Sequence, residues 1–322
     1  SALSRFSTRS PRRGLPHSKR FLVPEIPLIR EHDFQYGQIE VLAPGIRRLT
    51  ARNPSAFTYY GTGTYIIGAG TVAVIDPGPD DPAHLNALIT GLEGEHISHI
   101  LVTHCHLDHS PGARLLQAAC DAPTYAFGPH GAASEHRDAG TEEGVDVDFD
   151  PDVRLVHGQR FSVGALEVEC IHTPGHTSNH MCFALPASGD VFSGDHVMGW
   201  STSVIIPPDG DMADYLNSLQ LMLDRKDNRY WPTHGPPINT PADYVAALIA
   251  HRHQRMDDIL KLLAETPMHI PQMVGPLYPG LDPRLIGGAR LSILASLRYL
   301  MANGEIEASD GMPMQCTYRR VT

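Results

Sequence analysis

Four metal-ligand side chains within six residues, directly after an apolar stretch, limit the folds open to this sequence. Residues 100–102 read Ile-Leu-Val, and after Thr103 the run 104–109 reads His-Cys-His-Leu-Asp-His. An apolar run of this kind is typical of a buried strand, and a loop that follows such a strand is held rigidly yet stays open to solvent. Imidazole and carboxylate groups are common ligands of Zn²⁺. Because four of them crowd a single tetrahedral ion, we expect His104 and His106 to bind one metal and Asp108 and His109 another.

Three further candidate ligands lie downstream, each in a glycine-containing turn after an apolar segment. They are His176, Asp195 and His234. Seven nitrogen and oxygen ligands, including one carboxylate that can bridge, fit a centre of two metal ions. Two Zn²⁺ suit this mixed set, and Mn²⁺ or iron would also be tolerated.

The region from residue 34 to 238 alternates short β-branched or aromatic runs with helical patterns. Strands are expected within 39–50, 58–70, 71–78, 97–104, 124–128, 153–158, 166–173, 181–186, 190–195 and 229–234, and helices within 82–94, 112–121 and 211–225. Such alternation predicts sheets covered by helices, an α/β architecture.

A second unit is expected at 239–322. Pro241 suits the first position of a long helix, and Asp282 with Pro283 opens another helix that stops at Asn303 and Gly304. Two short strands around Asp310-Gly311 should follow. Helices followed by a hairpin predict a small winged-helix-like domain. This unit has eight Lys/Arg and eight Asp/Glu residues, so no DNA partner is expected.

Composition removes several classes of protein. The net charge is −11, which argues against broad nucleic-acid binding, and five cysteines without a Cys-x-x-Cys pair exclude a disulfide scaffold and a zinc ribbon. We expect no membrane partner. Residues 1–33 form a predicted basic arm, because the first twenty hold six Lys/Arg and no acid. The favoured location is the cytoplasm. The mitochondrial matrix is the alternative, if the arm is a transit-peptide remnant.

The ligand run, with His176, Asp195 and His234, resembles the metallo-β-lactamase superfamily over residues 40–238. The resemblance implies a four-layer αββα sandwich with the site at one edge. It also implies that His104, His106 and His176 hold the first metal, that Asp108, His109 and His234 hold the second, and that Asp195 bridges them. Asp76, in the segment Ile-Asp-Pro-Gly-Pro, matches an aspartate that supports the metal-binding loop without ligating metal.

The segments TPGHTSNH, FSGDHVMGW and THGPPI resemble more narrowly the lactamase-β-like hydrolases with a C-terminal winged helix. Animal members of that group are mitochondrial endoribonucleases that act on single-stranded RNA. The expected function is therefore a metal-dependent hydrolase, which uses a metal-bridging hydroxide on an ester-type or phosphodiester bond. The substrate is either a small ester, thioester or lactone, or single-stranded RNA. A mononuclear-iron enzyme of the persulfide dioxygenase type is the alternative from another class, and a homodimer is possible.

Two candidate catalytic residues follow from this interpretation. Asp108 is expected to orient the nucleophile and move its proton, besides ligating. His180 could contact the substrate or give a proton to the leaving group, and a packing role is the equal alternative. Ser201, Thr202 and Ser203 could line the cleft or only satisfy local backbone, and His251 and His253 are expected at the surface or between domains. Cys105 should point away from the metals as a buried thiol.

Overall fold

The structure is a computed structural model that describes residues 25–131 and 144–321. Most of the predicted basic arm, residues 1–24, lies outside the described residues. Its remaining part, 25–33, packs on the rest of the chain: Ile26 and Ile29 contact a buried cluster, and the Ile29 amide donates to the Gly199 carbonyl at 2.8 Å.

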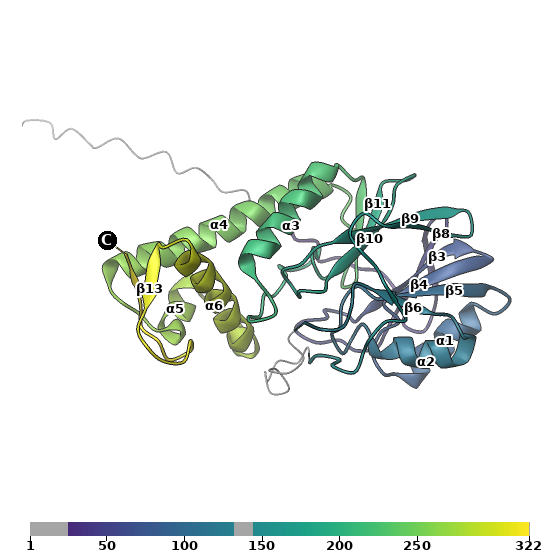
Figure 1. Ribbon diagram of the computed structural model, residues 1–322, viewed down its shortest axis with the longest axis horizontal. Coiled ribbons are helices and arrows are strands. Elements are labelled where there is room, and N and C mark those ends of the chain that lie inside the picture. Colours follow the sequence, from purple (N-terminus) through teal and green to yellow (C-terminus); the bar gives the residue numbers. More distant parts are fainter. Residues whose placement is uncertain (1–24, 132–143, 322) are drawn as a thin grey trace, which may run out of the picture.

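Two mixed sheets form the larger part of the molecule (Figure 1). The first sheet has the order β1-β2-β3-β4-β5-β6-β7, with β4, β5, β6 and β7 parallel. Its strands are β1 (Glu40–Ala43), β2 (Ile46–Thr50), β3 (Gly63–Ala69), β4 (Thr71–Ile75), β5 (His96–Leu101), β6 (Thr124–Ala126) and β7 (Val153–Arg154). The second sheet has the order β12-β11-β10-β9-β8. Its strands are β8 (Arg160–Val163), β9 (Leu166–His172), β10 (Met181–Leu185), β11 (Asp190–Gly194) and β12 (Arg229–Pro232).

Apolar side chains on both faces explain why the two sheets stack and are also covered outside. Along β3, Tyr65 and Ile67 face the second sheet, while Ile66 points to the opposite face. In β10, Phe183 faces the first sheet and Cys182 faces outward. Successive side chains on a strand alternate between faces, so strands that are apolar throughout need cover on both sides.

Helices supply that cover. On the first sheet lie α1 (Pro82–Gly91) and α2 (Pro111–Cys120). On the second lie α3 (Met212–Arg225) and the first half of α4 (Pro241–Glu265). The result is helix, sheet, sheet, helix, which confirms the predicted four-layer αββα sandwich.

The C-terminal region is helical with a small sheet. After α4 come α5 (Ile270–Leu277), the short 3₁₀ helix η1 (Pro283–Leu285) and α6 (Ile286–Ala302), then the antiparallel pair β13 (Ile306–Ala308) and β14 (Tyr318–Arg320). The expected long helices and terminal hairpin are present, and the assignment to a winged helix stays a prediction. Two elements were not predicted, α5 and the edge strand β8.

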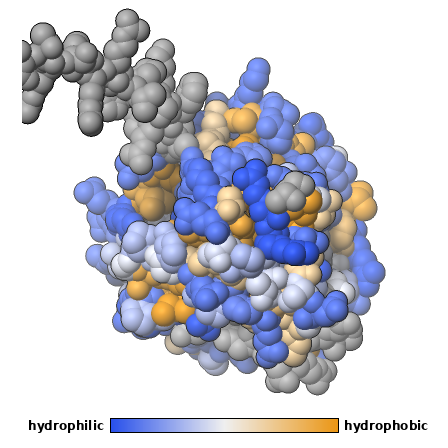
Figure 2. All heavy atoms as spheres, turned by 90° about the vertical axis from the view of Figure 1, so that its left-hand side faces the viewer, coloured by the Kyte–Doolittle hydropathy of each residue, from blue (hydrophilic) through white to orange (hydrophobic). Residues whose placement is uncertain are grey.

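One helical stretch of the described residues, Pro283–Ala302, is long and apolar enough to cross a membrane by length and composition alone. Seven residues of α6 are buried, and most of them pack against α4, α5 and β13. The end of the molecule formed by this unit shows hydrophilic residues with apolar ones interspersed (Figure 2). The stretch is therefore covered on one side by its neighbours in this region.

Candidate metal centre

The seven predicted ligands meet where strands of both sheets end. The run from His104 to His109 connects β5 to α2, and His176 lies between β9 and β10. Asp195 follows β11 and His234 follows β12. Each loop leaves the carboxyl end of its strand, so residues that lie up to 130 positions apart reach one edge of the sandwich.

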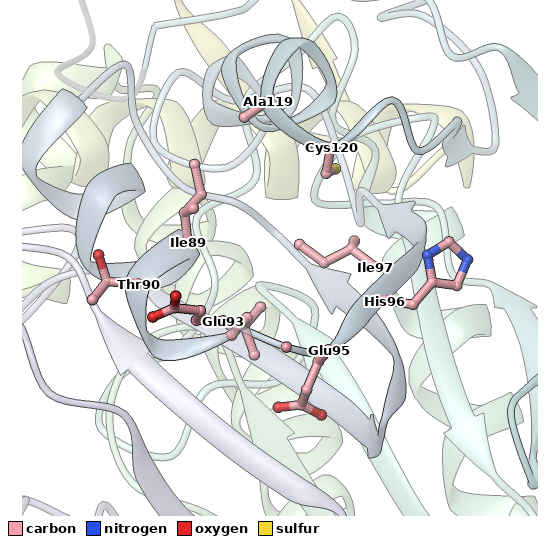
Figure 3. Close-up of a pocket in the computed structure, with 10 residues that line it drawn as sticks. Ile89, Thr90, Glu93, Glu95, His96, Ile97, Ala119 and Cys120 are labelled. Carbon is pink, nitrogen blue, oxygen red and sulfur yellow. The ribbon is translucent and has the colours of Figure 1, made fainter.

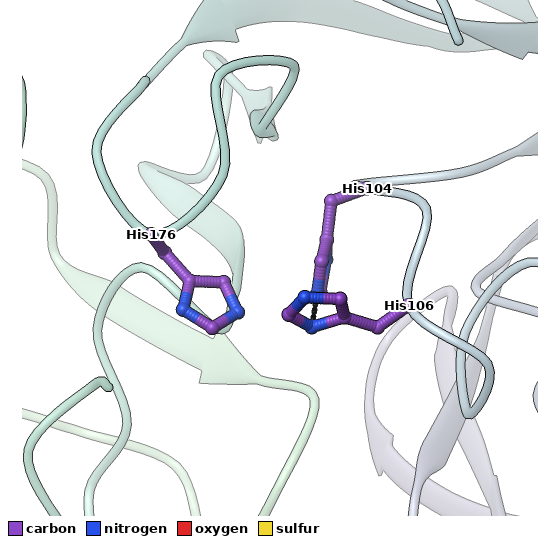
Figure 4. Close-up of side chains that lie close together, drawn as sticks. All are labelled: His104, His106 and His176. Carbon is purple, nitrogen blue, oxygen red and sulfur yellow. Dashed lines mark hydrogen bonds between the residues drawn. The ribbon is translucent and has the colours of Figure 1, made fainter. Parts of the chain in front are cut away.

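The first set of ligand atoms belongs to His104, His106 and His176. These atoms lie within 4.8 Å of one another. Nε2 of His104 is 2.9 Å from Nδ1 of His106, and the ring of His176 comes toward this pair from the opposite loop (Figure 4). This is the trio that the sequence resemblance assigned to the first metal.

The second set consists of Asp108, His109 and His234, again within 4.8 Å of one another. Oδ2 of Asp108 is 3.2 Å from Nε2 of His109 and 3.1 Å from Nε2 of His234. Asp195 lies between the two sets: its Oδ2 is 3.3 Å from Nε2 of His234 and 3.9 Å from Nε2 of His176. That position is the one a bridging carboxylate requires.

Unpartnered buried atoms show that this centre fits metal ions. Nε2 of His109, Nε2 of His176 and Oδ1 of Asp195 are buried without a hydrogen bond among the described residues. Such atoms carry a desolvation cost unless a ligand compensates it. The opposite nitrogens are anchored, because Nδ1 of His176 donates to the Val204 carbonyl at 2.7 Å and Nδ1 of His234 lies 3.2 Å from the Gly61 carbonyl. An imidazole anchored through one nitrogen presents the other to a metal, and this pattern is usual in metalloproteins.

Asp76 supports the centre from beneath. Its Oδ1 accepts the Thr103 amide at 2.8 Å, and its Oδ2 accepts the hydroxyls of Thr103 and Thr233 and lies 3.0 Å from Nδ1 of His109. The backbone of Asp76 has a φ of 48°, a left-handed conformation that aspartate tolerates better than most residues. Thr103 and Thr233 each precede a ligand histidine. This repeated Thr-His pair was a signal that sequence reasoning did not use.

Burial sets the proton state of the first trio. It lowers the pKa of His104, His106 and His176, and the neighbouring imidazoles lower the pKa of His104 and His106 further. These rings are therefore neutral near pH 7, the form in which imidazole binds a metal.

Charge sets the proton state of the second set. Burial alone would raise the pKa of Asp108 and Asp195, but His109 and His234 outweigh it and hold both well below their usual range. Conversely, burial would lower the pKa of His234, and the two carboxylates raise it to about 10. Without metal this set therefore keeps protons on its histidines.

His180 lies under the ligand loop. Its ring is fully buried, Nδ1 is 2.8 Å from the Thr173 hydroxyl, and Nε2 accepts the Asp195 amide at 3.2 Å. With both nitrogens engaged, no atom of the ring remains for a substrate. The geometry favours the packing alternative over the predicted catalytic contact.

Cys105 points away from the ligands, as expected, since its sulfur accepts a hydrogen bond from Asn179 at 2.9 Å. Ser203 satisfies local backbone, donating to the carbonyls of Asp195 and His196. Ser201 and Thr202 instead line a cavity between the loop 198–204 and the C-terminal helices. Sequence reasoning placed no substrate-binding residue on the C-terminal helices, yet His251 and Arg252 of α4 line the same cavity.

This cavity, of about 190 Å³, lies between the loop 198–204 and the C-terminal helices. Its wall includes Val204, whose carbonyl anchors His176. A larger cavity of about 520 Å³ lies where α1 and α2 end and β5 begins (Figure 3). Because the ligands follow the end of β5, that larger cavity is at the opposite end of the strand from the metal centre.

Comparisons with known proteins agree with this geometry. The sequence profile of the Metallo-beta-lactamase superfamily matches residues 59–234. The chain is 32% identical over 287 residues to the Beta-lactamase-like protein 2 homolog of Drosophila melanogaster, covering 83% of this chain and 94% of the relative. It is 30% identical to an atrochrysone carboxyl ACP thioesterase of Cryptosporiopsis, covering 74% and 69%.

Among solved structures, a beta-lactamase domain protein from Burkholderia ambifaria superposes with a TM-score of 0.75 at 24% identity, covering 90% of this chain and 96% of that one. The fold is thus shared beyond the range of clear sequence similarity. The profile match contains all seven predicted ligands, whose side chains the structure brings together. The chain belongs to the metallo-β-lactamase superfamily and is a metal-dependent hydrolase of that superfamily.

Proposed function

We propose that this hydrolase cleaves thioesters of small acyl groups and that its two metals are zinc. The cavity between the loop 198–204 and the C-terminal helices carries the proposal. Its walls are largely apolar, and its volume of about 190 Å³ suits a short acyl chain or one ring. Apolar residues on these walls are Phe57, Met198, Trp200, Tyr278, Leu281 and Leu285.

The chemistry of the leaving group favours a thioester over a phosphodiester or an alkyl ester. Hydrolysis forms a bond between a water oxygen and the acyl carbon and breaks the C–S bond. A thiol has a pKa of about 8.5, so it leaves as a thiolate with little need for a proton donor. His180 has both nitrogens engaged, so it is not placed to give a proton to a leaving group. A poorer leaving group would need such an acid.

The metal ions and Asp108 would have different roles in the hydrolysis. Two metal ions, when bound, supply a water ionised near neutral pH and a Lewis acid for the carbonyl oxygen. Asp108 is the most exposed of the seven ligands, with 15% of its side chain exposed, so water or a substrate can reach it. Its Oδ2 is engaged by Thr62 at 3.0 Å and by His234. Oδ1 is therefore the atom that can hold the proton of the attacking water.

A second candidate, single-stranded RNA cleavage, is favoured by a group of aromatic rings beside the site. Tyr59 stacks on Trp200 with ring centroids 4.7 Å apart. Tyr60 contacts Tyr59, and Phe34 contacts Tyr60, so the group contains four rings. Aromatic faces of this kind stack bases. The net charge of −11 works against a polyanion, so this candidate ranks second.

One paired assay tests the proposal. Protein loaded with zinc or manganese is given acetyl, hexanoyl and benzoyl thioesters of N-acetylcysteamine, and released thiol is measured. Labelled single-stranded RNA is incubated in parallel. Asp108→Asn, prepared identically, should lose activity at least about 100-fold. The matched control Asp257→Asn, an exposed carboxylate on α4, should keep it.

The outcomes separate the candidates. Metal-dependent thiol release that is lost in Asp108→Asn supports the thioesterase. RNA cleavage without thiol release overturns it in favour of the nuclease. Metal analysis of the protein as purified decides between two zinc ions and the single iron of a dioxygenase.

A further inference from the structure

Arg252, on the cavity side of α4, is a buried cation that has no carboxylate partner among residues 25–131 and 144–321. Only 5% of the residue is exposed. One end of its guanidinium donates to the Ser203 carbonyl, and its centre lies 5.1 Å from the ring of Tyr215. Its Nε is buried with no hydrogen bond, and no ion pair reaches it from any described residue. Burying a charge in this way is costly unless an opposite charge is supplied.

A second cation lies one turn later on the same helix. The guanidinium of Arg255 is 4.3 Å from the ring of Tyr278, which lines the cavity, and it donates to the Leu277 carbonyl. Its Nε also lacks a partner within the described part of the chain. The nearby carboxylate of Asp258 is engaged with Gln254 and Lys261. Arg252 therefore lines the cavity and Arg255 lies behind its wall at Tyr278, two positive charges in a protein whose net charge is −11.

Two further unpartnered polar atoms complete the set. Nε1 of Trp200 and Nδ1 of His251 are buried atoms without a hydrogen bond in the described residues, and both side chains line the cavity. Burial, followed by the charges of Arg252 and Arg255, lowers the pKa of His251 to about 4. The neutral ring at pH 7 is consistent with a positive potential in the cavity.

We propose that this cavity binds the free carboxylate of a dicarboxylic monothioester, with Arg252 as the residue that determines specificity. The inference rests on the proposed thioesterase function and names its substrate class. The loop 198–204 contacts both the metal centre and Arg252, the two places where the ends of such a substrate would bind. The Val204 carbonyl anchors His176 of the metal centre, and the Ser203 carbonyl anchors Arg252. The thioester would lie at the metals and the carboxylate at Nε of Arg252.

The size of the cavity limits the length of the acyl group. At about 190 Å³ it is somewhat larger than a cavity of roughly 150 Å³ that holds benzene, and smaller than the usual pocket for a drug-sized ligand. Acyl chains of about four to six carbons, counted with both carbonyl carbons, fill such a volume. A phosphate is the other anion that arginines bind well, so the test must separate the two.

The test compares a charged and a neutral acyl group of equal length. Adipoyl and hexanoyl thioesters of N-acetylcysteamine contain no phosphate and differ only in the terminal carboxylate. The metal-loaded enzyme should show a kcat/KM at least tenfold higher for the adipoyl thioester. Arg252→Gln keeps a donor for Ser203 and removes the charge. It should lower the ratio of the two kcat/KM values, adipoyl over hexanoyl, by roughly 10- to 100-fold. Arg290→Gln, which removes an exposed arginine of α6, should behave as wild type.

A binding measurement keeps the subsite testable apart from the reaction. Adipate and hexanoate are titrated into the metal-loaded protein by calorimetry. Adipate should bind the wild type at least tenfold more tightly than hexanoate does. In Arg252→Gln this difference in affinity should disappear. If that variant does not fold, Trp200→Phe removes one donor alone and should weaken adipate about three- to tenfold.

Each result decides something different. Equal kcat/KM for the two thioesters overturns the carboxylate subsite and leaves the thioesterase standing. No turnover of either thioester overturns the thioesterase, and the adipate titration then decides the subsite alone. RNA cleavage or binding that depends on Arg252, with no preference for adipate, identifies phosphate as the anion and overturns the proposal.

Discussion

Asp76 is the side chain on which the geometry of the metal centre depends most among the residues that do not ligate. One carboxylate oxygen accepts from two threonine hydroxyls and faces Nδ1 of His109, while the other accepts the Thr103 amide. It therefore fixes the starts of two ligand loops, one from each sheet, and it orients His109 toward the metals. Its own side chain is 1% exposed.

Asp76→Asn tests this role. The new amide can still accept the Thr103 N–H, but its NH₂ group cannot accept the two hydroxyls or the His109 N–H. We expect a loss of roughly 2–4 kcal/mol in the free energy of unfolding and a 10- to 100-fold weaker affinity for the second metal. Urea denaturation and competitive chelator titration measure the two effects. Unchanged metal affinity would show that Asp76 serves only stability.

His180 provides a second test at this scale, because its two possible roles give different kinetics. A packing histidine replaced by glutamine should lower kcat per metal-loaded chain by less than about tenfold and leave the pH–rate profile unchanged. A general acid would cost about 10²–10⁴-fold and remove the limb of the profile that its titration produces. Steady-state rates between pH 5.5 and 9, normalised to metal content, separate these results.

At the level of elements, the strongly patterned parts of the fold were predictable from sequence. The apolar segment before the ligand run became β5, and Pro241 did open α4. Both α5 and β8 were missed for local reasons. The sequence of α5, IPQMVGPL, holds two prolines and a glycine, and β8 is a four-residue edge strand with mixed burial.

The metal ligands were predictable because four of them are adjacent in sequence. The cavity was not predictable, because Phe57, Trp200, Arg252 and Leu285 come together only through the packing of α4 and α6 on the sandwich. The periodicity of the sequence identifies Arg252 as one polar residue in a helix, but it cannot show that the side chain lines a cavity. Nor could it show that His180 lies beneath Asp195, since that depends on the approach of β10 to β11.

The contact of α1 with the first sheet predicts sensitivity to acid. His84 is buried on this helix, and its Nε2 lies 2.8 Å from the Thr64 hydroxyl, which donates to the Asp76 carbonyl. Burial lowers the pKa of His84 to about 4. The unfolded chain takes up this proton near pH 6.5 and the folded chain resists it down to about 4. The free energy of unfolding should therefore fall as pH drops from 6.5 to 4, by up to about 3 kcal/mol for this residue, and stay level above 6.5.

Urea midpoints of the wild type and His84→Gln at pH 7.5, 5.5 and 4.5 check this expectation under one metal condition. The variant should be less stable at pH 7.5 by about 1 kcal/mol, and the difference should shrink or reverse by pH 4.5. His96→Gln, an exposed histidine at the start of β5, should follow the wild type at every pH. Parallel curves for all three proteins would exclude His84 as the source of the pH dependence.

At the level of the whole molecule, α4 connects the sandwich to the C-terminal helices. Its first half contributes Tyr244, Val245 and Leu248 to the buried cluster on the second sheet. Its second half contributes Met256, Ile259, Leu260 and Leu263 to the cluster with α5 and α6. The hydroxyl of Tyr244 also donates to the carbonyls of Met198 and Gly199, at the start of the loop that walls the cavity. A helix shared in this way should transmit loss of packing in one region to the other.

Leu248→Ala measures this coupling, since the side chain is 1% exposed where α4 meets the second sheet. Removing it should cost about 2–5 kcal/mol. Circular dichroism at 222 nm follows the helices, of which α4 and α6 are the longest, while tryptophan fluorescence recorded in a Trp200→Phe background follows Trp231 of β12. In the wild type both should report one transition, and in the variant both midpoints should fall together. Ile89→Ala, on the exposed side of α1, should change neither unfolding midpoint by much.

A shift of the helical signal alone would show that the C-terminal region unfolds independently. The cavity would then depend on a docking equilibrium between two units instead of on one cooperative fold.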